Sequence, residues 1–202
     1  MQNLHIIDGV LQGADFVPSP NFNERPTKND RPDISGIVIH NISLPPSQFG
    51  QSDQHGTHYV KAFFQNRLSP DDHPYFATIA DLQVSAHLLI ERDGAITQFV
   101  NFNDRAWHAG QSSYLGRTAC NDYTIGIELE GDDFCAFDDR QYHALTQVII
   151  AIYQAYPATR HHLMGHSDIS PQRKTDPGAY FDWQKIRHMV AKLDQITSQS
   201  QS

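Results

Sequence analysis

Long apolar runs are missing from this 202-residue chain. No stretch approaches the roughly 20 consecutive apolar residues that a membrane span needs, so we expect no membrane-spanning segment. The N-terminal segment MQNLHIIDGVLQGADF has no lysine or arginine before its short apolar run, and it carries Asp8 inside that run. We therefore do not expect it to act as a signal peptide.

Cysteine and positive charge are both scarce. The two cysteines, Cys120 and Cys135, form neither a CxxC pair nor a disulfide framework, which is typical of a reducing compartment. Lysine and arginine number 15 against 23 aspartates and glutamates, and the formal net charge is −8. Because a nucleic acid or an anionic membrane surface would repel such a chain, we expect neither a nucleic-acid partner nor a membrane partner. These features together predict a cytoplasmic protein.

The composition is nevertheless that of a folded protein, with 39% hydrophobic and 19% charged residues. The length, together with the lack of an internal repeat or linker, predicts a single domain over residues 1–202, and we expect the protein to be a monomer. Its core is expected from about residue 12 to 196, followed by a polar, frayed tail. Histidine is abundant, with 12 residues, so each group of histidines is a candidate ligand set for a metal.

Strand and helix patterns alternate along the chain. Apolar runs with β-branched residues or period-2 alternation predict two strands and a hairpin with an Asp-Gly turn, at 37–40, 124–130 and 84–100. Helical spacing predicts helices at 57–68, 140–156 and 182–196. Residues 15–35 and 42–56 have the composition of surface chain and of a long loop. This order predicts an α/β fold with a mixed central β-sheet flanked by helices on both faces.

The predicted strand TIGIELE has two distinct faces. Ile125, Ile127 and Leu129 form an apolar face, whereas Glu128 and Glu130 lie on the polar one. Either glutamate could be a general base if that face lined a cleft. Edge strands also commonly present glutamates to solvent, and the pattern does not choose between these alternatives.

Three residues have the character of zinc ligands. His40 ends an apolar strand, His166 follows a glycine, and Asp176 precedes a Pro-Gly pair. Catalytic zinc sites use three such protein ligands and leave one position to water. A capping histidine and a turn aspartate would give the same pattern, so spacing alone leaves both interpretations open.

Two other motifs overlap this region. His162 and His166 are four residues apart, as in an HExxH helix, but no glutamate follows His162 and Gly165 is unfavourable within a helix. The segment GHSDI resembles a serine nucleophile elbow, but Ile169 stands where that turn needs glycine. Both motifs are therefore disfavoured.

Two further features could contact a substrate. Lys174 could stabilise a developing oxyanion, although a lone loop lysine is usually solvated. The segment Trp107-His108-Ala109-Gly110 is compatible with a sugar-binding or peptide-binding groove, although tryptophan is more often a core residue. The residues alone leave these alternatives open.

Longer segments carry a stronger signal when they are taken in order: IVIHNISLPPSQFG, DDHPYFATIADLQVSAHLLIERDGAITQFV, RAWHAGQSSYLGR, CNDYTIGIELEG and GHSDISPQRKTDPG. Over about residues 12 to 187 the chain resembles the zinc N-acetylmuramoyl-L-alanine amidases, most closely their AmpD-type cytoplasmic branch. That branch acts on 1,6-anhydro-muropeptides during cell-wall recycling. The resemblance implies a mixed sheet with helices on both faces, a Zn²⁺ cofactor and a muropeptide substrate.

The resemblance also implies roles for individual residues. The zinc ligands would be His40, His166 and Asp176. Glu128 matches the general base, and Lys174 matches the group that stabilises the transition state. Three positions match the substrate groove: Asn41, Trp107 and His108.

The chain departs from some relatives at two positions. Gln83 and Ala119 stand where those relatives carry arginines, which could hold substrate carboxylates. Arg117 or Arg173 could compensate. Two other functions also stay open at this point, a non-catalytic muropeptide-recognition module on the same fold and a histidine-rich metal buffer.

Overall fold

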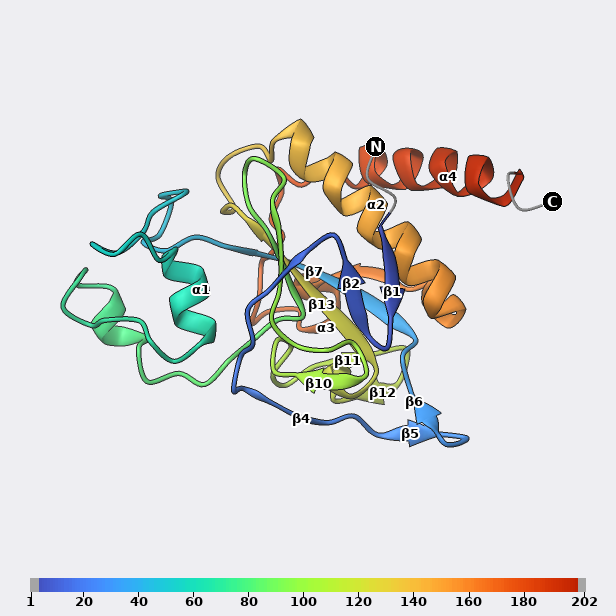
Figure 1. The fold of residues 1–202 in the computed structure, drawn as a ribbon, viewed down its shortest axis with the longest axis horizontal. Helices are drawn as coiled ribbons and strands as arrows, with labels where there is room; N and C mark the ends of the chain where they lie inside the picture. The colour runs from blue at the N-terminus through green and yellow to red at the C-terminus, as the bar shows by residue number, and fades with distance from the viewer. Residues whose placement is uncertain (1–3, 200–202) are drawn as a thin grey trace.

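A six-stranded sheet forms the centre of the molecule (Figure 1), in the strand order β14-β7-β13-β8-β9-β3. The computed structural model describes residues 4–199. The bounds of these strands are β3 Asp15–Phe16, β7 Gly36–Ile42, β8 Leu88–Ile90, β9 Ile96–Gln98, β13 Thr124–Glu130 and β14 Leu163–Gly165. The pair β8-β9 is antiparallel and the other neighbouring pairs are parallel, which confirms the predicted mixed sheet.

Shorter elements surround this sheet. Four two-stranded sheets in the described part of the chain pair β1 His5–Ile7 with β2 Val10–Gln12, β4 Phe22–Glu24 with β10 Asp104–Ala106, β5 Thr27–Lys28 with β6 Arg31–Pro32, and β11 Ser113–Tyr114 with β12 Arg117–Thr118. The helices are α1 Tyr59–Phe64, α2 Asp139–Ala155, α3 His166–Ile169 and α4 Trp183–Gln199. The 3₁₀ turns are η1 Phe76–Thr78, η2 Cys120–Asp122 and η3 Pro157–Thr159.

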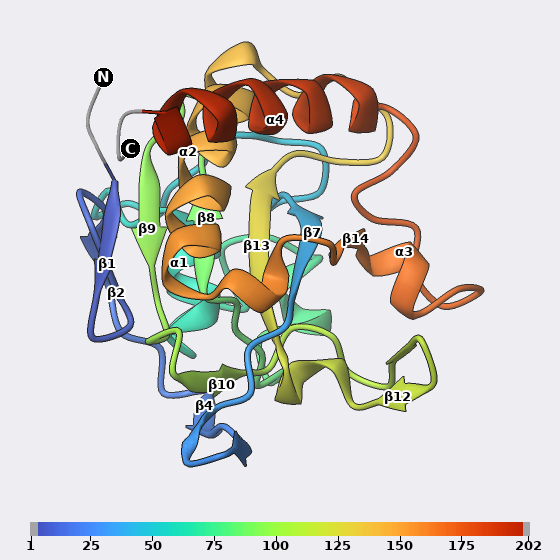
Figure 2. The ribbon, with the colours of Figure 1, turned by 90° about the vertical axis from the view of Figure 1, so that its right-hand side faces the viewer.

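One face of the sheet packs against α2, and α4 packs against α2 in turn (Figure 2). Alternate residues of the central strands, such as Ile37, Ile39, Ile125 and Ile127, enter this main hydrophobic cluster. Helix α2 starts with a capping box formed by Asp138 and Gln141. Since successive strand residues point to opposite faces, the residues between these isoleucines face away from α2.

The opposite face carries α1 and α3. Leu89 of β8 joins Phe63 and Phe64 of α1 in a second cluster, and Val38 of β7 joins Ile169 of α3 in a third. Helices therefore cover both faces, as predicted. Helix α1 is shorter than the predicted helix over 57–68.

The position of strand β13 decides between the two alternatives that the sequence left open for its glutamates. It lies between β7 and β8, and all seven of its residues are buried, including Glu128 and Glu130. Because the protein covers both faces of an interior strand, its polar face meets other side chains instead of bulk solvent. The two glutamates are therefore interior groups and need partners or a cavity.

Both ends of the described chain extend the predicted bounds of the core. Leu4 and Leu11, which precede residue 12, belong to the main cluster. Helix α4 passes its predicted end at residue 196 and continues to Gln199, so this part of the expected frayed tail is helical; residues 200–202 lie outside the described residues. Between residues 4 and 199, no helix is both long enough and apolar enough to cross a bilayer.

Candidate active site

Strands β14, β7 and β13 are parallel neighbours, and their register brings three predicted site residues to the same level of the sheet. In the β7-β13 pair, His40 is the partner of Glu128. In the β14-β7 pair, Gly165 is the partner of Ile39, and His166 follows as the next residue. The carboxyl ends of parallel strands meet at one edge of a sheet, where α/β folds commonly bind ligands. His40 and Glu128 also share the face opposite α2, because they alternate with the isoleucines of the main cluster.

Asp176 reaches the same place from the loop that follows α3. Its carbonyl oxygen accepts a hydrogen bond from Ser167 N–H at 2.9 Å, and the Asp176-Pro177 peptide bond is cis. Gly165 makes the approach of this loop possible, because a Cβ there would lie 2.7 Å from Cδ of Pro177. The glycine that weakens the HExxH interpretation therefore has a packing role.

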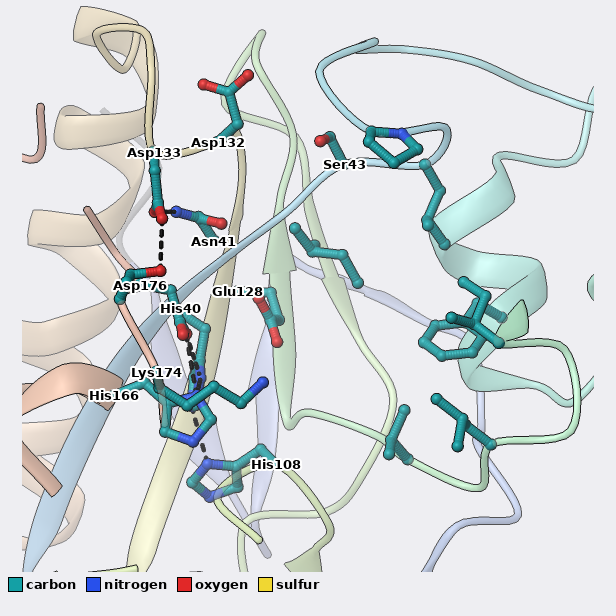
Figure 3. Close-up of a pocket in the computed structure, with 18 of the residues that line it drawn as sticks. His40, Asn41, Ser43, His108, Glu128, Asp132, Asp133, His166, Lys174 and Asp176 are labelled. Carbon is teal, nitrogen blue, oxygen red and sulfur yellow. Dashed lines mark hydrogen bonds and ion pairs between the residues drawn. The ribbon is translucent and has the colours of Figure 1, made fainter. Parts of the chain in front are cut away.

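Three candidate ligand atoms converge at this point (Figure 3). The Nδ1 atoms of His40 and His166 lie 2.9 Å apart, and each is 3.0 Å from Oδ2 of Asp176. The remaining ring nitrogens face other partners: His40 Nε2 lies 2.9 Å from His108 Nδ1, and His166 Nε2 lies 3.1 Å from the Ala109 carbonyl oxygen. Both Nδ1 atoms are thereby left for a shared ion. Two imidazoles and one carboxylate are a donor set that Zn²⁺ prefers.

The protonation states also fit a metal centre. Burial is the main cause that lowers the pKa of His40 to about 4, against the opposing effect of Asp176. Burial by itself raises the pKa of Asp176, but hydrogen bonds from His166 and His40 outweigh it, so that this pKa lies below its ordinary value. A neutral imidazole at His40 and an ionised carboxylate at Asp176 are the forms that bind metal.

Glu128 lies on the pocket wall beside these ligands. Its side chain is buried, and Oε2 has no hydrogen-bond partner in the described structure. Burial raises the pKa of Glu128 well above its ordinary value, the charge of Asp176 raises it further, and Lys174 acts in the opposite direction. A buried carboxyl group with a free oxygen and a raised proton affinity has the properties of a general base.

Glu130 has a different environment, although it is only two residues away. Its Oε1 accepts hydrogen bonds from Gly50 N–H at 2.5 Å and His58 Nε2–H at 3.0 Å, and Oε2 accepts from Arg92 N–H at 3.2 Å. His58 in turn caps α1 through its Nδ1 atom. Glu130 therefore anchors the loop over 43–58 and has no oxygen free for a substrate.

A pocket of about 480 Å³ opens over these groups. Lys174 is exposed on its rim, and Figure 3 shows its ammonium group and the Glu128 carboxyl group pointing into the same space. The far wall is apolar and comes from α1, η1 and the segment before β8, with Phe63, Phe64, Tyr75, Ile79, Leu82 and Val84. The sequence patterns indicated the polar groups, but they did not indicate that these apolar residues share a cavity with them.

The three predicted groove residues all line this pocket. Asn41 Nδ2 donates to Asp133 Oδ1 at 2.8 Å, and the Trp107 indole N–H donates to Asn23 Oδ1 at 2.7 Å. His108 is buried behind His40, against β13. Asp133 was not among the predicted site residues, although its place just after β13 at the same sheet edge is a signal that could have found it.

Three further residues that the sequence analysis considered have other environments: His162 and Arg117 lie outside the pocket, and Arg173 lines it. His162 is outside the ligand group and packs edge-on against Tyr114, with 5.8 Å between ring centroids. Arg117 is engaged by Asp33 at 2.7 Å, away from the pocket. Arg173 lines the pocket, and its guanidinium donates to the Ala109 and Gln111 carbonyl oxygens.

Comparisons with known proteins agree with this geometry. A family model described as N-acetylmuramoyl-L-alanine amidase matches residues 29–179. The 1,6-anhydro-N-acetylmuramyl-L-alanine amidase AmpD of Haemophilus influenzae is 53% identical over 183 residues, which cover 90% of this chain and 95% of that protein. A crystal structure of a selenomethionine AmpD derivative has a TM-score of 0.85 at 50% identity and covers 92% of this chain and 98% of that one.

A more distant solved structure is a complex with a substrate. It is AmiD from E. coli in complex with the substrate anhydro-N-acetylmuramic acid-L-Ala-D-γ-Glu-L-Lys, with a TM-score of 0.58 at 26% identity. It covers 94% of this chain, and this chain covers 66% of it. The family match spans the three candidate metal ligands and Glu128 as well as most of the chain. This chain therefore belongs to the N-acetylmuramoyl-L-alanine amidase family.

Proposed function

We propose that this chain hydrolyses the amide bond between the lactyl group of 1,6-anhydro-N-acetylmuramic acid and L-alanine, with Zn²⁺ as cofactor, in peptidoglycan recycling. The observation that carries the proposal is the convergence of His40, His166 and Asp176 beside Glu128 in one pocket. Relatives with about half of their residues identical bear the name of this activity. The anhydro-muramyl tripeptide bound by AmiD supports the same class of substrate.

Each polar group of the site has a proposed task. His40, His166 and Asp176 would hold the zinc ion, which supplies Lewis acidity towards a carbonyl group and towards water. Glu128 accepts the proton of the attacking water and returns it to the departing amine of L-alanine. Its raised proton affinity suits both steps, because a weaker base would not hold the proton until the amine leaves. Lys174 donates to the carbonyl oxygen as negative charge develops there, an effect of about 3 kcal/mol for one such donor.

The remaining pocket residues would bind the substrate. Asn41, held by Asp133, and Trp107, held by Asn23, present fixed groups at the pocket wall. The apolar wall opposite them can pack against the sugar ring. Gln83 and Ala119 carry no charge, and of the two arginines that could compensate only Arg173 lines the pocket, so we propose that the part of its guanidinium not bound to Ala109 and Gln111 contacts carboxylates of the stem peptide.

The setting of the reaction belongs to the same proposal. Cys120 and Cys135 are both free thiols, which supports a cytoplasmic location. We expect the protein to act as a monomer on a small muropeptide. A recognition module that binds without cleaving has no support from the relatives, which are named as amidases.

Side-by-side digestion of purified anhydro-muropeptide and of intact sacculi, with and without a chelator, tests this function. We expect mass spectrometry to detect free peptide from the anhydro-muropeptide, loss of that product with chelator, and its return when Zn²⁺ is added. Full activity in protein shown to be free of metal would overturn the zinc assignment. Tight binding of muropeptide without any product would instead identify a recognition module.

A further inference from the structure

A series of buried hydrogen bonds extends from His40 away from the pocket. His40 Nε2 lies 2.9 Å from His108 Nδ1, and His108 Nε2 lies 3.3 Å from Thr124 Oγ1. The Thr124 hydroxyl donates to the Cys120 carbonyl oxygen at 2.7 Å. All four residues are buried, and Thr124 and Cys120 have no exposed surface. Bulk water therefore cannot replace the hydrogen bond between Thr124 and Cys120.

The far end of the series determines the direction of every hydrogen bond. The Cys120 carbonyl oxygen can only accept, so the single hydroxyl proton of Thr124 points to it. The same hydroxyl must then accept from His108, which places the ring proton of His108 on Nε2. A neutral imidazole with that proton has its lone pair on Nδ1, which accepts from His40 Nε2–H. His40 is left with a bare Nδ1, the atom that faces His166 and Asp176.

We propose that His108 and Thr124 are positioning residues that fix the tautomer of His40 and so keep its Nδ1 lone pair available to the metal. This inference rests on the proposed zinc centre. The other histidine ligand needs no such relay, because the Ala109 carbonyl oxygen accepts directly from His166 Nε2–H. Outer groups that orient a metal-binding histidine typically change metal affinity by about 10-fold to 100-fold when they are removed.

The packing around His108 supports a fixed ring orientation. A Cβ on Gly126 would lie 2.4 Å from Cγ of His108, so only glycine at this position of β13 admits the ring. The backbone N–H groups of His108 and Ala109 both donate to Asn121 Oδ1, at 3.1 and 2.7 Å. Thr124 belongs to the same strand and does not line the pocket. It therefore acts on the ligand only through His108.

The test compares three threonine variants. Thr124→Val keeps the side-chain shape and removes the hydroxyl, whereas Thr124→Ser keeps the hydroxyl. Thr97→Val is the matched control, because Thr97 is also buried and its hydroxyl has no hydrogen-bond partner in the described structure. The measurements are the Kd for Zn²⁺, by competition with a chromophoric chelator, and the histidine tautomers of the metal-free protein, by long-range ¹H–¹⁵N NMR.

We expect Thr124→Val to weaken zinc binding by about 10-fold or more and to give His40 a mixture of tautomers. Thr124→Ser should recover most of the affinity, and Thr97→Val should match the wild type. Unchanged affinity and an unchanged His40 tautomer in folded Thr124→Val protein would overturn the relay.

The wild-type spectrum keeps the proposal testable if Thr124→Val does not fold. Protonation of His108 on Nδ1, or of His40 on Nδ1, in the metal-free wild-type protein contradicts the relay directly. The proposed zinc centre is judged separately, because wild-type protein that binds no zinc refutes the metal site whatever the NMR tautomers are.

Discussion

At the scale of single residues, the two glutamates of β13 show how surroundings set chemical roles. Three hydrogen bonds occupy both oxygens of Glu130, and they outweigh the rise in pKa that burial causes. Among the described residues, Oε2 of Glu128 has no hydrogen-bond partner, and burial raises the pKa of this carboxyl group above its ordinary value. The same residue type on the same strand face is therefore a structural anchor at one position and, in the function proposed above, the proton carrier at the other.

Glu128→Gln keeps the shape of the side chain and removes its basicity. We expect kcat to fall by about 100-fold or more, with zinc content unchanged, because the variant loses proton transfer but no metal ligand. Steady-state kinetics on anhydro-muropeptide and metal analysis of the same sample check this. If Glu130→Gln lowered kcat as much while Glu128→Gln did not, the assignment of the base would be wrong.

Lys174→Met removes a charge that faces the pocket. We expect kcat to fall by about 100-fold to 1,000-fold with a small change in KM, because the ammonium group acts mainly on charge that develops in the transition state. Lys192→Met, on the exposed side of α4, is the control and should keep wild-type kinetics. A rise in KM with unchanged kcat would show that Lys174 only binds the ground state.

At the scale of elements, Glu130 joins the central strand to the loop and helix that form one side of the pocket. It holds the backbone of Gly50 and the side chain of His58, and His58 caps α1. The long loop after β7 is thus attached to β13 by a buried carboxylate. Burial raises the pKa of Glu130, but the hydrogen bonds from His58, Gly50 and Arg92 outweigh it, so the pKa lies below the ordinary value of 4.5.

This pKa predicts how acid weakens the fold. Because the folded-state pKa is the lower one, the unfolded chain binds more protons between the two values, and the free energy of unfolding rises with pH there. The contribution of Glu130 is complete above pH 4.5 and is lost as pH falls through the folded-state pKa. We expect Glu130→Gln to lower the free energy of unfolding by about 1–3 kcal/mol at neutral pH, and much less in acid.

Urea unfolding of wild type and variant across the acid range measures this difference. Glu24→Gln, an exposed glutamate on β4, is the control and should behave as the wild type at each pH. A difference between wild type and Glu130→Gln that stayed constant into acid would contradict the ionised anchor.

At the scale of the whole molecule, the ligand group ties together distant parts of the chain. His40 lies 126 residues from His166 and 136 residues from Asp176 in sequence. The three residues come from β7, from the start of α3 and from the loop after it. An ion bound here therefore favours the folded state over the unfolded chain, in which these ligands are dispersed.

Zinc should accordingly stabilise the protein. At about 100 times the Kd, we expect the free energy of unfolding to rise by ~2.7 kcal/mol and Tm by roughly 5–10 °C relative to chelator-treated protein. Thermal unfolding followed by circular dichroism checks this. Asp176→Ala should lose most of the zinc-dependent shift, and a variant that kept the full shift would place the stabilising ion elsewhere.

Much of the fold and many site residues follow from the sequence by itself. Local patterns predict the Asp93-Gly94 hairpin, where Gly94 has a φ of 87°, and helix α2. Such features depend on interactions between residues close in the chain, so a short window contains their cause. The longer segments indicated the amidase family, which the comparisons confirm.

Only the tertiary structure decided between the alternatives that spacing left open. The parallel register of β14, β7 and β13 brings His166, His40 and Glu128 to one edge, and the sheet order buries β13 on both faces. The tertiary structure also leaves Oε2 of Glu128 without a hydrogen-bond partner among the described residues, whereas both oxygens of Glu130 accept hydrogen bonds. The physical reason is that desolvation and hydrogen bonding depend on which distant segments pack around a side chain, and no local sequence pattern contains that information.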